Sequence, residues 1–180
     1  MYTEGMTISA IGRVLSVKLG MVFDWIKKTQ KALQIMNKKV EQLRNNGSRT
    51  PQEISLDEMW TYVGARTGDK RNSVWIWTAV FYDKVIFEVG KRDEKTFLNL
   101  YDKLPEAKKY YSDGYEVYKS WLPEEKHRGK KSGKTNRNEG IHSFLRDKLS
   151  RLRRKTKAYS KSIDMLTNSI VLVILTYGLL

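Results

Sequence analysis

Hydrophobic residues recur with a helical period through the first 45 residues of the chain. Ile8, Ile11, Val14 and Leu15 fall on one face of a first predicted helix. Val22, Trp25 and Ile26 fall on one face of a second. A short break separates the two faces, which is the spacing of a helix-turn-helix. A plain helical hairpin that packs on a core explains the same periodicity equally well.

The second predicted helix, over residues 18–28, would be the recognition helix if this segment binds DNA. It runs on into a charged amphipathic stretch with an apolar stripe at Ile35, Met36, Val40 and Leu43. This stretch is a candidate contact between copies of the chain, and it would equally pack on its own domain.

After a polar linker over residues 46–53, the pattern changes to strands. Residues 53–63, 73–82 and 84–90 are rich in β-branched and aromatic side chains, which predicts three strands. The segment 64–72 and the short Tyr-Asp-Lys break that follows the second strand are turn-like, so the three strands form a meander.

The following residues alternate helices with one more strand. We expect a helix over 95–104 capped by Asp93, a strand over 109–112, a helix over 115–121, a basic loop over 126–137 and a helix over 139–154. Three strands, a helix, a strand and further helices in this order are the layout of the ribonuclease-H-like fold. The predicted class is therefore α/β, with a mixed sheet flanked by helices.

The predicted organisation has four parts: a helix-turn-helix arm at 1–45, a linker at 46–53, an α/β domain at 54–162 and an apolar helix at 163–180. The apolar run 170–175 in the last part is shorter than the roughly 20 residues that cross a membrane. We expect this helix to be buried against the α/β domain.

Charge narrows the choice of partner. The formal net charge is +14, and most of the excess lies in residues 126–161, where Glu139 and Asp147 are the only acids. A membrane surface or a ribosome would attract such a segment, but positive charge around a lone acidic residue points first to nucleic acid. The first residues lack the features of a signal peptide, which favours an intracellular, cytoplasmic protein without a membrane segment.

Three short acidic motifs are the candidates for chemistry: Asp57 in LDEMW, Asp113 in YYSDGY and Glu139 in NRNEGI. The chain has no cysteine and two histidines, so a metal ion would be held mainly by oxygen. Each residue also has a simpler interpretation: an exposed strand charge, an Asp-Gly turn and a helix N-terminal charge, respectively. Glu58 should point to the opposite face of its strand and is the second-choice ligand.

Longer strings surround these motifs: LDEMWTYVG, GKRDEKTF, LYDKL, YYSDGYEVYKSWLPEEKH and NEGIHSFLRDKLSRLRRKTKAYSKS. In this order they resemble the transposases of the insertion sequence one family, over residues 55–162. The N-terminal string YTEGMTISAIGRVLSVKLGMVFDWIKK resembles the helix-turn-helix of the same transposases. Relatives usually carry a cysteine-rich zinc-binding segment before it, which this chain apparently lacks, and often an asparagine where this chain has His142.

The resemblance implies a DNA transposase of the DDE type, which cleaves and transfers strands at the ends of an insertion sequence. Asp57, Asp113 and Glu139 would be the catalytic residues and would hold two Mg²⁺ or Mn²⁺ ions. The implied partners are double-stranded DNA, both element ends and target, and further copies of the chain on that DNA, within the nucleoid.

We expect these basic residues to contact DNA: Lys18, Lys27, Lys28, Lys134, Arg137, Arg146, Arg151, Arg153, Arg154 and Lys155. A solvated basic face is the alternative. The aromatic residues Trp60, Tyr62, Trp75 and Trp77 are expected in the core rather than stacked on bases. Two other functions stay open: an inactive DNA-binding remnant or regulator, and a ribonuclease that acts on RNA–DNA hybrids.

Overall fold

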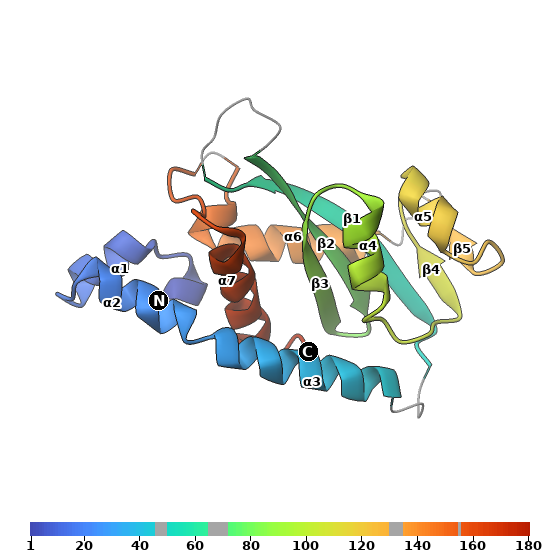
Figure 1. Ribbon diagram of the computed structural model, residues 1–180, viewed down its shortest axis with the longest axis horizontal. Coiled ribbons are helices and arrows are strands. Elements are labelled where there is room, and N and C mark those ends of the chain that lie inside the picture. The colour runs from blue at the N-terminus through green and yellow to red at the C-terminus, as the bar shows by residue number, and fades with distance from the viewer. Residues whose placement is uncertain (46–49, 65–71, 130–134, 155) are drawn as a thin grey trace.

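A mixed sheet with helices on both faces forms the centre of the molecule, and a group of N-terminal helices lies at one end (Figure 1). The computed structural model of the chain describes residues 1–45, 50–64, 72–129, 135–154 and 156–180. Most of the expected turn between the first two strands therefore lies outside the described residues, as does part of the linker.

The N-terminal segment is helical, as predicted. A 3₁₀ turn at Tyr2–Glu4 precedes α1 (Ile8–Val14), α2 (Leu19–Lys27) and α3 (Gln30–Asn45). The Thr7 side chain accepts a hydrogen bond from the backbone N–H of Ala10 at 3.1 Å and so caps α1.

The sheet has five strands: β1 (Glu53–Tyr62), β2 (Ser73–Phe81), β3 (Lys84–Gly90), β4 (Lys109–Tyr111) and β5 (His127–Arg128). Their spatial order is β3-β2-β1-β4-β5. The first three strands form the predicted antiparallel meander, while β4 lies parallel to β1 and β5 lies parallel to β4. This mixed sheet confirms the predicted ribonuclease-H-like fold, although β5 falls where the sequence predicts a loop.

The remaining helices are α4 (Glu94–Tyr101), α5 (Glu116–Trp121), α6 (Asn136–Lys148) and α7 (Ile163–Thr176), with a 3₁₀ turn, η4, at Ser150–Leu152. The prediction of one helix over 139–154 was wrong at both ends. The observed helix begins earlier and stops at Lys148 because Leu149 adopts an extended conformation. Leu149 is fully buried, so burial of its side chain accompanies the break.

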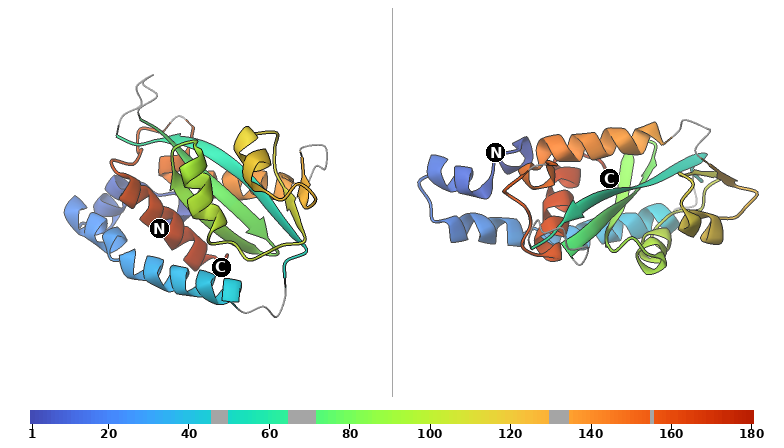
Figure 2. Two further views of the ribbon diagram at one scale, coloured as in Figure 1. Left: turned by 45° about the vertical axis from the view of Figure 1, so that its right-hand side comes forward. Right: turned by 90° about the horizontal axis from the view of Figure 1, so that it is seen from above.

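Alternation along the strands gives the sheet two apolar faces. On one face, Met59 and Ile76 belong to a buried cluster with Leu145 of α6 and Ile170 of α7. On the other face, Leu56, Trp77 and Ile86 pack with α4 and α5, in a cluster that includes Phe97 and Tyr118. The two views in Figure 2 show α6 on one side of the sheet and α4 on the other.

The N-terminal helices share a core with the sheet instead of standing apart as an arm. Ile11, Val22 and Met36 belong to the same buried cluster as Ile170 of α7. Helix α7 contacts α2, α3 and β3, and so joins the two groups of elements. Of the predicted stripe of α3, Met36 and Val40 are buried in the chain's own core, as one of the two alternatives expected, whereas Ile35 is exposed. None of the described helices combines the length and apolar character that a membrane crossing requires.

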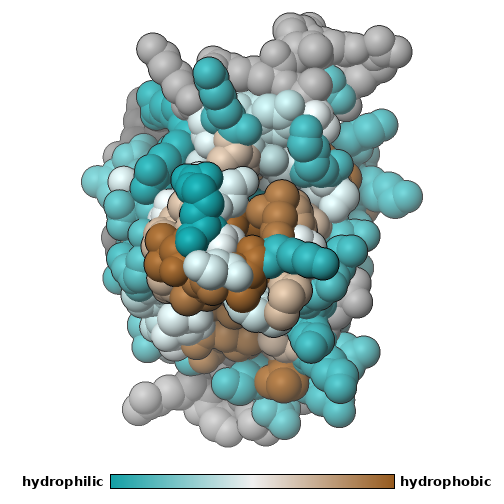
Figure 3. All heavy atoms as spheres, turned by 90° about the vertical axis from the view of Figure 1, so that its left-hand side faces the viewer, coloured by the Kyte–Doolittle hydropathy of each residue, from teal (hydrophilic) through white to brown (hydrophobic). Residues whose placement is uncertain are grey.

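Apolar side chains also gather on the outer surface of α1 and α2. Val14, Leu15, Leu19, Met21 and Trp25 are all exposed there, Trp25 by 42%. Figure 3 shows hydrophobic residues grouped on this end of the molecule, among hydrophilic neighbours. An apolar surface of this kind is typical of a contact with another molecule.

The position of α7 generates a stability prediction with an internal control. Ile170→Ala should lower the free energy of unfolding by about 3 kcal/mol because it opens a cavity between the helix and the sheet. Ile163→Ala removes the same atoms at the start of α7, where the side chain is 45% exposed, and should cost about 0.5 kcal/mol or less. Urea unfolding measures both, and equal losses would show that α7 does not form part of the core.

Candidate metal centre

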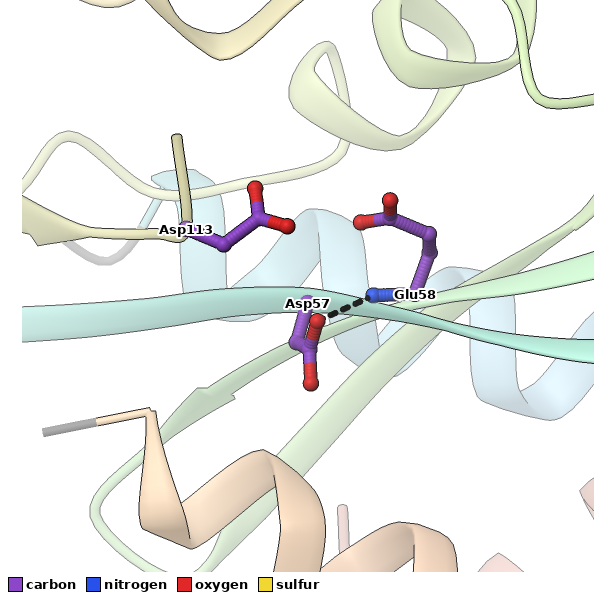
Figure 4. A group of neighbouring side chains, drawn as sticks. All are labelled: Asp57, Glu58 and Asp113. Carbon is purple, nitrogen blue, oxygen red and sulfur yellow. Dashed lines mark hydrogen bonds between the residues drawn. The ribbon is translucent and has the colours of Figure 1, made fainter. Parts of the chain in front are cut away.

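Asp57 lies within β1, on the face of the sheet covered by α6 (Figure 4). Its side chain is only 21% exposed, and its Oδ1 accepts a hydrogen bond from the backbone N–H of Glu58 at 2.9 Å. Burial raises the pKa of Asp57 to about 6, and repulsion from Glu58, Asp113 and Glu139 adds to the shift. A buried carboxylate among other acids is a site that a cation would stabilise.

Asp113 stands just beyond the end of β4. Because β4 pairs with β1 in parallel, the end of β4 brings Asp113 beside Asp57. One carboxylate oxygen of Asp113 accepts a hydrogen bond from the backbone N–H of Tyr115 at 2.8 Å, next to the start of α5. The residue therefore makes the Asp-Gly turn interaction that was its simpler interpretation, and its second oxygen is left for a ligand.

Glu58 completes the group of carboxylates in the described part of the chain. Ligand atoms of Asp57, Glu58 and Asp113 lie within 4.8 Å of one another. Figure 4 shows Glu58 on the opposite face of the strand from Asp57, as alternation predicts, with the Asp113 carboxylate turned toward it.

The charge of Glu58 already has protein partners. Arg92 donates to its Oε1 from Nε at 2.8 Å and also from Nη2, and the Tyr118 hydroxyl donates to its Oε2 at 2.7 Å. Burial, with the nearby negative charge of Glu58, raises the pKa of Tyr118 well above its usual value, so the phenol keeps its proton. Glu58 is therefore anchored within the fold. By contrast, neither Asp57 nor Asp113 forms a salt bridge with lysine or arginine among the described residues.

Glu139, the third predicted acid, lies in the first turn of α6 and is exposed. It is close enough to raise the pKa of Asp57, although it does not belong to the tight group of three carboxylates. The structure thus brings Asp57 and Asp113 together directly and places Glu139 on the helix that faces Asp57.

A buried polar network fixes α6 against the sheet. Thr78 of β2 lies opposite Asp57 in the strand register. The side chain of Asn138 donates to the Thr78 carbonyl at 3.0 Å and to its hydroxyl at 2.9 Å, and His142 Nε2 lies 2.9 Å from the same hydroxyl. Because Glu139 follows Asn138, this network determines where Glu139 stands relative to Asp57.

The hydrogen bonds also assign the proton on His142. The Thr78 hydroxyl donates to the Asp57 carbonyl at 3.1 Å, so it accepts from an Nε2–H of the imidazole. Nδ1 then carries a lone pair, 3.7 Å from Asp57 Oδ2. Burial, with a smaller effect from Arg146, lowers the pKa of His142 to about 4, so the ring is neutral near pH 7. Sequence reasoning noted His142 but missed Thr78 and Asn138. The spacing of Asn138 and His142, four residues apart on one helix, was a signal for Asn138, whereas Thr78 lies on a distant strand and gave none.

The predicted DNA contacts fall into different environments. Lys18, Lys27, Lys28, Arg137, Arg153 and Arg154 are exposed, Arg146 is half-buried, and Lys134 and Lys155 lie outside the described residues. Arg151 departs from a solvated basic face because it is buried.

Among the aromatic residues expected in the core, Trp77 and Tyr62 are buried and Trp75 is half-buried. Trp60 is exposed, so the expectation was wrong for that residue.

A mixed sheet with one acid on β1, a second after β4 and a third on a following helix defines a ribonuclease-H-like protein with an acidic centre. A model of the IS1 transposase family matches residues 53–176, which is more than half of the chain. The chain therefore belongs to the IS1 transposase family. No curated protein sequence matches it significantly.

The raised pKa of Asp57 predicts a pH-dependent cost to folding. In the unfolded chain the carboxyl has the ordinary pKa of 3.8, so the cost is absent below that pH, grows between pH 3.8 and about 6, and is complete above it. Asp57→Asn should therefore stabilise the metal-free chain at about pH 8, by an amount of order 2 kcal/mol, and by less at about pH 5. Thermal unfolding in a chelator measures this, and a benefit independent of pH would contradict the assignment.

The hydrogen bonds to Thr78 predict that the free energy of unfolding depends on its hydroxyl. Thr78→Val keeps the shape of the side chain but removes the hydroxyl that His142 Nε2 and the Asn138 amide bond, although Asn138 keeps its bond to the Thr78 carbonyl, and this loss should cost about 1–3 kcal/mol. Thr78→Ser keeps the hydroxyl and is the matched control. Urea unfolding should show a larger loss for valine than for serine, and the reverse order would mean that the hydroxyl does not hold α6.

Proposed function

We propose that this chain is a DNA transposase that carries out metal-dependent strand cleavage and strand transfer at the ends of an insertion sequence. The observation that carries the proposal is the pairing of Asp57 and Asp113 at adjacent strands, with no lysine or arginine in a salt bridge to either carboxylate among the described residues. Membership of the IS1 transposase family supports the same reaction.

The oxygen donors of this pair suit Mg²⁺ or Mn²⁺. When bound, two such ions supply activation of the attacking oxygen and stabilisation of the leaving oxygen at phosphorus. Asp57 would hold one side of the centre from β1, and Asp113 would hold the other with the oxygen that does not bond Tyr115. Glu139 would complete the ligand set from α6, where the Thr78 network positions it.

The same residues serve two successive displacements. In the first, a water oxygen bonds to phosphorus, the bond to the 3′ oxygen breaks, and the proton of water passes to solvent or to the leaving group. In the second, the released 3′-hydroxyl attacks a phosphodiester of the target DNA in the same way. Water and the hydroxyl are equivalent nucleophiles, so one set of carboxylates is sufficient.

Basic side chains would hold the DNA around this centre. Arg137 and Arg146 lie on α6 with Glu139, while Lys18, Lys27 and Lys28 lie on or beside α2. We assign α2 to the recognition of element ends, and we expect several copies of the chain to assemble on that DNA within the nucleoid. The apolar surface of α1 and α2 is available for contacts in such an assembly.

Strand cleavage and strand transfer on a duplex that carries the ends of the parent element test the proposal. With Mg²⁺ or Mn²⁺ present, the chain should nick and join DNA. Asp113→Asn should lower the rate more than about a hundredfold, because even the loss of an outer partner of a metal ligand costs about 10–100-fold. Asp83→Asn makes the same change in the exposed turn after β2 and should leave the rate unchanged.

The outcomes separate the proposed functions. Metal-dependent cleavage that Asp113→Asn abolishes would support the transposase. Binding to element ends without cleavage by any form of the chain would contradict it and favour a DNA-binding regulator. Cleavage confined to the RNA strand of a hybrid duplex would identify a ribonuclease.

A further inference from the structure

A pocket outside the acidic centre lies where the N-terminal helices meet the segment that follows α6. Its lining comes from the start of α1, from Phe23 of α2, from Ser150 and Arg151 of η4, and from residues 157–161. The pocket has a volume of about 170 Å³, several times the roughly 30 Å³ that a water molecule occupies in the liquid.

Arg151 is the unusual member of this lining, because it is only 6% exposed. Its Nη1 donates to Ser160 Oγ at 2.9 Å, and its guanidinium carbon lies 5.4 Å from the centre of the Tyr2 ring. Its buried Nε has no hydrogen-bond partner, and among the described residues no carboxylate forms a salt bridge with it. A buried cation without an anion is costly unless a ligand compensates it.

The rest of the lining favours an anion. Lys157 and Lys161 add two positive charges at the exposed side of the pocket, and Ser9 and Tyr159 add hydroxyl groups. In the described part of the chain, no aspartate or glutamate lines the pocket. The pocket thus brings a buried arginine and two exposed lysines together in one lining, unlike a solvated basic face, on which every cation is exposed.

We propose that this pocket binds a phosphate group, and that the phosphate belongs to the backbone of bound DNA. The choice of DNA as the source rests on the proposed function. The planar guanidinium of Arg151 offers several N–H donors, which is the geometry that suits phosphate oxygens. The pocket would anchor the duplex at the junction of α1, α2 and η4, away from the carboxylates that perform the chemistry.

The salt dependence of DNA binding tests the backbone contact. In the full chain, Lys157→Ala with Lys161→Ala removes both exposed pocket cations, while Lys38→Ala with Lys39→Ala removes two exposed lysines from α3 as the matched control. Two phosphate contacts contribute about two units to the slope of log affinity against log salt concentration. The slope should fall by about this amount in the pocket variant and stay near that of the unchanged chain in the control. Equal slopes in the two variants would overturn the proposal.

A second measurement does not depend on DNA or on catalysis. Sodium phosphate, exchanged for sodium chloride at constant ionic strength, should raise the melting temperature of the unchanged chain and of the α3 control, but not of the pocket variant. Arg151→Lys keeps the charge but loses the planar donors, and it should reduce the stabilisation by phosphate even where it folds normally.

The two measurements distinguish the source of the phosphate. Stabilisation by inorganic phosphate without a change in the DNA slope would overturn the assignment to the DNA backbone and leave a site for a free anion. If the pocket variant changes neither the salt dependence of DNA binding nor the stabilisation by phosphate, the proposal that the pocket binds phosphate would be overturned altogether. If both measurements support the pocket but the chain cleaves no strand, the proposed transposase activity would be contradicted and the phosphate site would stand. Failure of one proposal is therefore distinguishable from failure of the other.

Discussion

Burial of the Asp57 carboxylate is the constraint on which the centre of this structure depends. The strand holds Asp57 against α6, with Asp113 beside it and Glu139 on the facing helix. Burial, with a smaller contribution from the neighbouring acids, raises the pKa of Asp57 to about 6. Arg92 and Tyr118 bond to Glu58, whereas among the described residues no lysine or arginine forms a salt bridge with Asp57 or Asp113. A divalent cation would remove this repulsion. The free energy that the metal-free fold loses by holding these carboxylates together would therefore contribute to the affinity of the site for the cation.

The arrangement of the helices follows from the need to hold that centre. The side chains of Asn138 and His142 on α6 bond to the hydroxyl of Thr78, and Asn138 also bonds to the Thr78 carbonyl, so the position of Glu139 depends on this residue of the neighbouring strand. Helix α7 packs behind this layer and joins the N-terminal helices to the same core. The pocket around Arg151 lies where those helices meet the segment that follows α6.

Periodicity and turn residues were sufficient to predict four strands, most helices and their order, because each strand alternates and each helix has an apolar face. They missed β5, where a two-residue strand in a basic segment has no periodicity to detect, and the end of α6, which depends on burial of Leu149. Asp57 and Asp113 were identified through their motifs. The partners of Glu58 and the bonds of Thr78 join residues far apart in sequence, so spacing alone could not reveal them.

The most direct test of this account is anomalous diffraction from crystals of the chain that have been soaked in Mn²⁺. The account predicts an ion bonded to carboxylate oxygens of both Asp57 and Asp113, while Arg92 and Tyr118 remain on Glu58. An ion held by Glu58 after displacement of Arg92, or no ion between Asp57 and Asp113 at saturating Mn²⁺, would contradict it.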